Sequence, residues 1–298
     1  MRCYGFIYNP RSGDGRRLEL LRGVKKNLRA TGVEVREYLA AGDPAAEART
    51  AVRDGCDVVV ACGGDGTVNG TASAVRGSGA VLGVLPLGTL NHFAKDLGIH
   101  GLAQAEQVLL TGTVREIDAG FVNGRLFVNN SGIGIYPVMV LEREKVRKAG
   151  IPKWPAFAWA FLRTAGKMPF MQLRIDADGV PMARSTPFLF VGNNEYAVEG
   201  KSLGTRPRLD GGLLGVYTAR HIGPTGLARI AFRALLGTIR HDRDFIAFTA
   251  KRLTVERKGR IHVSLDGEVC RLTGPLRYSI VPGAIRVLAP DVDRGVEE

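Results

Sequence analysis

The chain has 298 residues, a length that at roughly 150 residues per domain suggests two domains and excludes a disulfide-stapled miniprotein. Apolar residues make up 45% of the chain and charged residues 23%, which excludes an intrinsically disordered protein. The 41 basic and 29 acidic residues give a net charge of +12, which indicates an anionic partner: nucleic acid, an anionic membrane surface or a phosphorylated small molecule.

The first part of the chain alternates short apolar runs with helical spacing. The run Asp57-Val-Val-Val-Ala-Cys62 is continuous, as in strands that are buried on both faces of a parallel sheet. The alternation predicts a doubly wound α/β domain over residues 1–115, with ligands outside the carboxyl ends of the strands. The predicted strands cover residues 5–9, 33–39, 57–62 and 80–85, and the predicted helices cover 16–30, 45–54, 68–75, 91–96 and 102–110.

The rhythm changes near residue 115, and residues 116–298 are dominated by short strand patterns separated by turns. These patterns predict a second, mostly antiparallel β domain. The predicted strands lie around residue 117 and at 120–129, 171–176, 186–191, 213–218, 252–257, 261–265 and 285–288.

Two helical patterns interrupt the second domain. Residues 154–165 carry an apolar stripe with Trp159 off it, and in residues 227–240 the side chains of Arg229, Arg233 and Arg240 fall together opposite an apolar face. Such a helix either packs on the β domain with a solvated basic face or binds anionic lipid at the membrane surface. Both interpretations stay open.

The four cysteines, Cys3, Cys56, Cys62 and Cys270, occur singly and lack the paired spacing of a zinc site. We expect them to be reduced, as in a cytoplasmic protein. The apolar run at the amino terminus is too short for a signal peptide, and no apolar segment reaches the ~20 residues that cross a bilayer. We therefore expect a cytoplasmic protein that is soluble or peripheral at the inner face of the membrane.

The most informative segment is Gly63-Gly-Asp-Gly-Thr67, between a buried strand and a helix. Glycines in that position let backbone N–H groups approach an anion, and the helix amino terminus favours negative charge. Two further polar loops, Asn9-Pro-Arg-Ser-Gly13 and Pro86-Leu-Gly-Thr-Leu-Asn91, also follow predicted strands. In a parallel sheet all three loops emerge at one edge, so together they predict a phosphate site.

These loops, with Gly63-Gly-Asp-Gly-Thr-Val-Asn69 and the later Asp266-Gly-Glu268, resemble the diacylglycerol kinase catalytic family, which includes bacterial lipid kinases and the sphingosine and ceramide kinases. The Gly-Gly-Asp-Gly-Thr element is shared with NAD kinases, whereas the other motifs narrow the resemblance to lipid kinases. The resemblance implies a β-sandwich-like second domain, with ATP in the cleft between the domains.

The resemblance also implies roles for individual residues. Glu268 would be the general base, and Asp65 would act near Mg²⁺. Asp118 and Asp210 are further Mg²⁺ candidates. Asp266-Gly267 by itself is typical of a hairpin turn. The predicted nucleotide-binding residues are Asn9, Pro10, Arg11, Ser12, Gly13, Gly63, Gly64, Asp65, Gly66, Thr67, Val68, Asn69, Gly70, Gly88, Thr89 and Asn91.

Three positions depart from the family pattern. His92 stands where many bacterial members have an acid, and Gly211 stands where they have an acid that binds a structural Mg²⁺ ion. Either Asp210, one residue away from that position, takes the place of the acid, or the Mg²⁺ site is lost. The stretch Gly192-Asn-Asn-Glu-Tyr196 also differs, and its residues Asn194, Glu195 and Tyr196 either line a divergent acceptor pocket or form an ordinary loop.

The sequence therefore predicts an ATP- and Mg²⁺-dependent lipid kinase that phosphorylates diacylglycerol or a similar lipid and contacts an anionic membrane. The alternatives are a kinase for a soluble acceptor, as in NAD kinases, and a nucleotide- or membrane-binding protein without turnover. Nucleic acid is not expected as a partner, because no basic arm with interleaved aromatic residues is present. A homodimer, the choice of nucleotide and the identity of the lipid stay open.

Overall fold

The computed structural model describes residues 2–9, 15–148, 170–200, 204–220 and 223–291. The chain forms two compact units, one of residues 1–118 together with 282–298 and the other of residues 119–281. The predicted helix over residues 154–165 lies outside the described residues. Within the described part of the chain, no helix is both long enough and apolar enough to cross a membrane.

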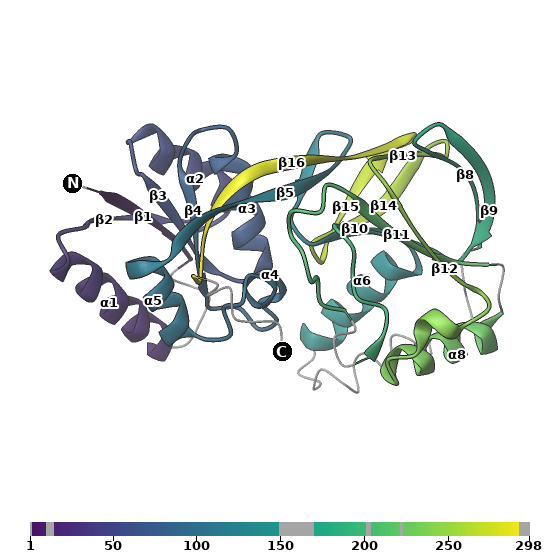
Figure 1. The fold of residues 1–298 in the computed structure, drawn as a ribbon, viewed down its shortest axis with the longest axis horizontal. Helices are drawn as coiled ribbons and strands as arrows, with labels where there is room; N and C mark the ends of the chain where they lie inside the picture. Colours follow the sequence, from purple (N-terminus) through teal and green to yellow (C-terminus); the bar gives the residue numbers. More distant parts are fainter. Residues whose placement is uncertain (1, 10–14, 149–169, 201–203, 221–222, 292–298) are drawn as a thin grey trace. The chain divides into compact units, whose positions relative to one another are not determined.

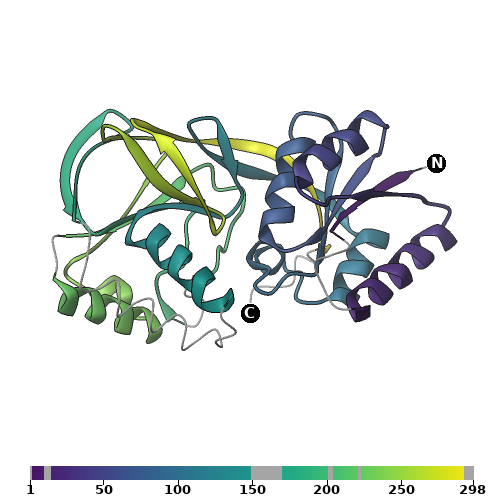
Figure 2. The same cartoon turned by 180° about the vertical axis from the view of Figure 1, so that it is seen from behind.

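The first unit is built on parallel strands in the order β2-β1-β3-β4. The strand β3 is buried along almost its whole length, as its continuous apolar run predicts. The helices α1 and α5 contact each other, as do α2 and α3, so the sheet is covered on both faces (Figures 1 and 2). The strands are β1 (Cys3–Tyr8), β2 (Glu34–Leu39), β3 (Val58–Gly63) and β4 (Val81–Pro86), and the helices are α1 (Gly15–Ala30), α2 (Pro44–Arg53), α3 (Asp65–Val75), α4 (His92–Asp96) and α5 (Leu102–Thr111).

Two long strands contribute to both units: β5 (Thr113–Val122) and β16 (Leu276–Ala289). In the first unit, Val287 of β16 pairs in parallel with Leu82 of β4. In the second unit, the beginning of β16 pairs with β13 (Arg252–Glu256). The carboxyl-terminal part of the chain thus returns to the sheet of the first unit.

The second unit contains antiparallel strands in two layers. One layer contains β13 between β8 and the start of β16, with β9 beyond β8. The other has the order β12-β11-β10-β7-β14-β15. Buried side chains of both layers, among them Leu173, Val216, Leu253 and Val263, form one core. The further strands are β6 (Arg125–Phe127), β7 (Asn130–Gly134), β8 (Met171–Ala177), β9 (Val180–Thr186), β10 (Phe188–Asn193), β11 (Leu214–Ala219), β12 (Phe245–Ala250), β14 (Arg260–Leu265) and β15 (Glu268–Thr273).

A smaller core lies where helices meet the second layer. Ile135, at the start of α6 (Ile135–Lys148), packs with Ala219 of β11 and with Leu227 and Ile230 of α8 (Pro224–Leu235). The helix α8 ends before residue 240, where the predicted helix ends, because Gly237 adopts a positive φ of 69° and the N–H of Thr238 bonds to the carbonyl of Arg233. The predicted fold class, an α/β unit plus an antiparallel β-sandwich-like unit, is confirmed.

Two predicted strands need correction. The predicted strand 120–129 is the hairpin of β5 and β6, because Asn123 and Gly124 both have positive φ and turn the chain. The predicted strand 186–191 begins where β9 ends, and β10 starts at Phe188. Pro187, which has no backbone N–H to give to a ladder, separates the two strands.

Candidate active site

The glycine-rich turn joins β3 to α3. The helix begins at Asp65 rather than at residue 68, because Gly64 is extended and serves as the N-cap. Gly66, Thr67, Val68, Asn69 and Gly70 therefore belong to the helix and not to a loop. A side chain at Gly63 would lie 2.3 Å from Oγ1 of Thr67, so the strand end and the first helical turn are in direct contact. The amino terminus of α3, with its partial positive charge, points a row of backbone N–H groups out of the sheet edge.

A second predicted phosphate loop lies directly against this turn. A Cβ atom at Gly88 would lie 2.4 Å from the Cα of Gly64 and 3.0 Å from its nitrogen. The N–H of Leu87 also donates to the carbonyl of Gly63 at 3.1 Å. The two loops are therefore in backbone contact, and only glycine fits at position 88.

Asp65 ties α3 to α4. Its carboxylate accepts the backbone N–H groups of His92 (3.3 Å) and Phe93 (3.1 Å), at the amino terminus of α4. Asn91, in the left-handed region with φ 50°, donates from its side chain to the carbonyls of Gly88 and Pro86. Asp65 thus fixes the orientation of the loop from Pro86 to Asn91, called the Gly88 loop below. The contact uses the backbone of His92, so it does not depend on the imidazole that replaces the expected acid.

The third predicted loop begins beside the glycine-rich turn. Tyr8, the last residue of β1, pairs with Cys62 of β3, so Asn9 follows at the same sheet edge as Gly63. Pro10, Arg11, Ser12 and Gly13 lie outside the described residues. Thr89 is exposed in the Gly88 loop. Of the three loops, the structure thus brings two into contact and aligns the start of the third with them.

Glu268 lies in the second unit at a tight hairpin. Leu265 of β14 pairs with Glu268 of β15, and the two residues between them, Asp266 and Gly267, have φ values of 48° and 86°. Positive φ at both central positions is the type I′ turn that Asp-Gly favours. The turn leaves the side chain of Glu268 exposed to solvent.

The carboxylate of Asp266 holds this turn in place. It accepts the backbone N–H groups of Val128 (2.8 Å), Asn129 (2.8 Å) and Asn130 (2.9 Å), and the N–H of Asp266 donates to the carbonyl of Asn130. Hydrogen bonds to an ionised acceptor are stronger than neutral ones. Asp266 therefore positions Glu268 relative to the segment that precedes β7.

The same segment is held from its other side by Arg206, which is 3% exposed. Its guanidinium donates to the carbonyls of Val128 and Asn193 and to Oδ1 of Asn129. The sequence did not predict these contacts. The available signal was the pair of doublets Asn129-Asn130 and Asn193-Asn194 between apolar runs, because a polar side chain that the fold buries is normally hydrogen-bonded.

The segment 194–196 is not an ordinary exposed loop. Asn194 is 1% exposed, and its Oδ1 accepts the N–H of Gly211, the glycine that replaces the expected acid. The N–H of Tyr196 donates to the hydroxyl of Tyr217 at 2.6 Å, and its ring packs edge-to-face on Phe190 with centroids 5.5 Å apart. Glu195 between them is exposed. An acceptor pocket along this segment stays a prediction.

Each candidate Mg²⁺ ligand has contacts of its own within its unit. Asp118 is buried on β5 and accepts the N–H of Gly283, whereas Asp210, in the other unit, is exposed and lies 3.1 Å from Nε of Arg208. Among the described residues, no three His, Cys, Asp or Glu side chains group as a metal site.

Comparisons with known proteins identify the family of this chain. Residues 4–122 match the diacylglycerol kinase catalytic domain, and residues 143–289 match the YegS C-terminal NAD kinase beta sandwich-like domain. A protein of Pseudomonas aeruginosa named as a probable lipid kinase, YegS-like, is 35% identical over 259 residues, which cover 84% of this chain and 82% of the relative. The chain belongs to the bacterial diacylglycerol kinase and YegS-like lipid kinase family.

A further relative and two solved structures resemble the chain over most of its length. The diacylglycerol kinase of Bacillus subtilis is 28% identical over 269 residues, which cover 88% of each chain. The crystal structure of a diacylglycerol kinase from Bacillus anthracis superposes with a TM-score of 0.71 at 19% identity and covers 97% of both chains. Another structure from that organism gives a TM-score of 0.78 at 22% identity and the same coverage, so the family fold extends over nearly the whole chain.

The family assignment divides the candidate residues between its two domains. The glycine-rich turn, the Gly88 loop and Asp118 fall in the match to the catalytic domain, whereas Asp210 and Glu268 fall in the match to the C-terminal domain. The chain is thus a member of a family of lipid kinases, and its match to the catalytic domain implies the use of ATP.

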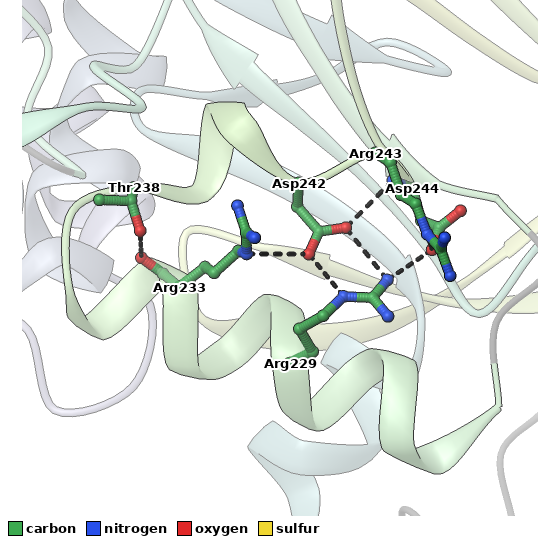
Figure 3. A network of polar contacts seen from close by, with 6 residues as sticks. All are labelled: Arg229, Arg233, Thr238, Asp242, Arg243 and Asp244. Carbon is green, nitrogen blue, oxygen red and sulfur yellow. Dashed lines mark hydrogen bonds and ion pairs between the residues drawn. The ribbon is translucent and has the colours of Figure 1, made fainter.

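The basic face of α8, one of whose predicted roles is a membrane contact, is paired with acidic side chains of the same unit. Asp242 and Asp244 accept hydrogen bonds from the guanidinium of Arg229, and Asp242 also lies 3.5 Å from Nε of Arg233 (Figure 3). These bonds, with that of Arg229 contributing most, hold the pKa of Asp242 below its usual value. Arg240 lies beyond the end of α8, 3.6 Å from Glu199. The three arginines thus have acidic partners, because acids outside the helix neutralise the face that its own sequence leaves basic.

Proposed function

We propose that this chain is an ATP-dependent lipid kinase that transfers the γ-phosphate to a hydroxyl of diacylglycerol or of a similar lipid at a membrane surface. The observation that carries the proposal is the backbone contact between Gly64 and Gly88. It sets two glycine turns and the amino terminus of α3 side by side, with no side chain between them. Such an arrangement suits the closely spaced negative charges of a nucleotide's phosphates.

In the proposed reaction the first unit binds Mg·ATP. The N–H groups at the junction of β3 and α3, from Gly63 to Thr67, with Gly88, Thr89, Asn91 and the loop from Asn9 to Gly13, bind its phosphates or sugar. The N–H of Val68 already donates to the carbonyl of Gly64 inside the helix. Asp65 keeps α3 and the Gly88 loop in register and lies near the Mg²⁺ ion of the substrate. Mg²⁺ neutralises phosphate charge that develops during transfer.

Glu268 is the proposed general base. Its carboxylate accepts the proton of the lipid hydroxyl while the hydroxyl oxygen forms a bond to the γ-phosphorus, and the bond from that phosphorus to the ADP oxygen breaks. Two observations support this role. The type I′ turn presents Glu268 to solvent at a fixed position, and Asp266 clamps the turn to the backbone of residues 128–130.

The test is transfer of label from Mg·ATP labelled at the γ-phosphate. The purified protein is incubated with vesicles that contain diacylglycerol, and organic extraction separates lipid phosphate from soluble phosphate. We expect labelled phosphatidic acid or a related phosphomonoester, formed only when vesicles are present. Label in a soluble acceptor such as NAD would favour the alternative kinase. Nucleotide binding without label transfer to any hydroxyl lipid in an extract would refute the proposal.

A further inference from the structure

The second unit contains a cavity that the proposed reaction does not use. It lies at one end of the β8–β9 hairpin, where β13 and the segments 257–258 and 274–275 close around it (Figure 1 labels β8, β9 and β13). Its volume is about 840 Å³. This value lies within the range of about 300–1,000 Å³ that is typical of small-molecule sites.

The strand register explains the hollow. Arg174 of β8 stands opposite Ala183 of β9 on one side and opposite Glu256 of β13 on the other. Gln172, two residues along β8, stands opposite Ser185. Directly opposed residues point to the same face of a sheet, so one long basic side chain is surrounded there by small and polar neighbours.

The charge of the cavity is unbalanced. Its described lining residues include the cations Arg174, Arg184, Arg257 and Lys258 but only one carboxylate, that of Glu256. Across the described part of the chain, no ion pair includes any of these cations. Like charges around one hollow repel each other unless an anion joins them. This contrasts with α8, whose arginines are matched by acids.

Arg184 adds a further guanidinium group to this charge. One of its terminal nitrogens donates to the carbonyl of Ala183 at 3.0 Å. Its Nε atom is buried, so only the terminal nitrogens can meet a ligand in the cavity. An anion with several oxygen atoms is the kind of ligand that can offer acceptors to several cationic side chains at once.

The wall formed by residues 274–275 is fixed. A Cβ atom at Gly274 would collide with the carbonyl oxygen of Arg257, so the two segments that close the cavity touch through their backbones. The N–H of Gly274 donates to the carbonyl of Gly259. The side chain of Asn123 donates to the carbonyls of Thr273 and Pro275 and accepts the N–H of Arg277. The cavity is therefore formed before any ligand arrives.

The cavity and Glu268 lie at opposite ends of one hairpin. In the β14–β15 pair, Leu265 faces Glu268 at the turn, and Arg260 faces Thr273 at the other end. Five steps of about 3.4 Å along a strand separate these ends by about 17 Å. A ligand in the cavity therefore cannot touch the proposed base.

We propose that this cavity is a second, non-catalytic binding site for a phosphate-bearing anion, either a phospholipid headgroup or a free phosphate compound. The site does not rest on the proposed kinase reaction. Its elements are the cations of β8, β9 and the β13–β14 connection and the fixed wall at Gly274.

The test compares the wild-type chain with the double variant Arg174→Ala/Lys258→Ala. The matched control is Arg243→Ala/Arg271→Ala, which removes the same charge from exposed positions of the same unit outside the cavity. Inorganic pyrophosphate is titrated into each protein by calorimetry. In a second arm, each protein is sedimented with vesicles of phosphatidylcholine alone or mixed equally with phosphatidylglycerol.

We expect the cavity variant to lose at least about tenfold in affinity for one of these probes, whereas the control changes less than about twofold, since each lost charge-assisted bond contributes about 1.5 kcal/mol or more. Loss toward pyrophosphate alone identifies a free phosphate compound, and loss toward mixed vesicles identifies a lipid headgroup. Equal behaviour of the cavity variant and the wild type, or an equal loss in the control, would overturn the proposal. Both variants should still bind nucleotide, so a failure here is distinct from a failure of the kinase proposal.

Discussion

The clamp that Asp266 forms can be tested by removing its carboxylate. In Asp266→Ala the N–H groups of Val128, Asn129 and Asn130 lose their acceptor, and Val128 and Asn129 are buried. At the lower limit of about 1.5 kcal/mol for each of the three charge-assisted bonds, the loss amounts to about 4.5 kcal/mol. Alanine at the positive φ of 48° adds about 1 kcal/mol.

The chain offers a matched control in Asp178. This residue also begins a type I′ Asp-Gly turn, with φ values of 51° at Asp178 and 89° at Gly179, and its carboxylate accepts the N–H groups of Lys251 and Arg252. The bond from Lys251 contributes most to holding the pKa of Asp178 below its usual value. This turn is exposed, so water can replace the lost acceptor, and we expect Asp178→Ala to lower the free energy of unfolding by about 2 kcal/mol.

Urea unfolding followed by far-ultraviolet circular dichroism measures both losses. Label transfer to diacylglycerol measures the consequence for the proposed base. We expect Asp266→Ala to reduce the transfer rate with nucleotide binding unchanged, and Asp178→Ala to leave both unchanged at temperatures where the proteins are folded. Equal destabilisation by the two substitutions, or equal transfer rates, would show that Asp266 has no special positioning role.

The remaining predictions concern the glycine turns, the Asp65 contact and the α8 network. Gly88→Ala should weaken nucleotide binding at least about tenfold and destabilise the first unit by about 1–3 kcal/mol, because its Cβ would overlap Gly64. The control is Gly101→Ala, since Gly101 has open space around it. Unchanged nucleotide binding by Gly88→Ala would contradict the close packing of the two glycine turns. Asp65→Ala should abolish productive Mg·ATP binding, because Asp65 holds the start of α4. The control Asp43→Ala, which removes a cap from α2, should leave this binding intact. Equal effects of the two substitutions in a nucleotide titration would refute the role of Asp65 in nucleotide binding. Asp242→Asn should destabilise the protein at neutral pH, because the lowered pKa of Asp242 means that its contribution is present above about pH 4 and is lost as the pH falls through the folded-state value. Urea unfolding should therefore show the difference between the wild type and Asp242→Asn shrinking as the pH falls through the folded-state pKa of Asp242, and a constant difference would contradict the ion-pair explanation.

The elements that the sequence predicted well are those whose local pattern matches their burial. The strand β3 is apolar throughout because both its faces are covered, and the Asp266-Gly267 turn forms because this pair tolerates positive φ. By contrast, β9 was missed except for its last residue, because it lies at the edge of its layer and carries exposed residues and Pro181. An edge strand with little burial has no apolar alternation to reveal it.

The contacts that hold the candidate site could not be predicted from local sequence patterns. The carboxylate of Asp266 binds backbone groups 136 to 138 residues away along the chain, and Arg206 binds the same segment from another loop. The acids that neutralise Arg229 follow the helix after a turn that Gly237 sets. Such partners depend on the tertiary fold, so sequence motifs singled out the residues of the predicted phosphate loops but not the residues that position them.

The most direct test of the central claim is the rate of γ-phosphate transfer to diacylglycerol vesicles by Glu268→Gln, with Glu199→Gln as an exposed control in the same unit. Loss of a general base lowers a rate by about 10² to 10⁴-fold. We predict a loss of that size in Glu268→Gln, with nucleotide binding unchanged and the control at the wild-type rate. Wild-type transfer by Glu268→Gln would contradict the account.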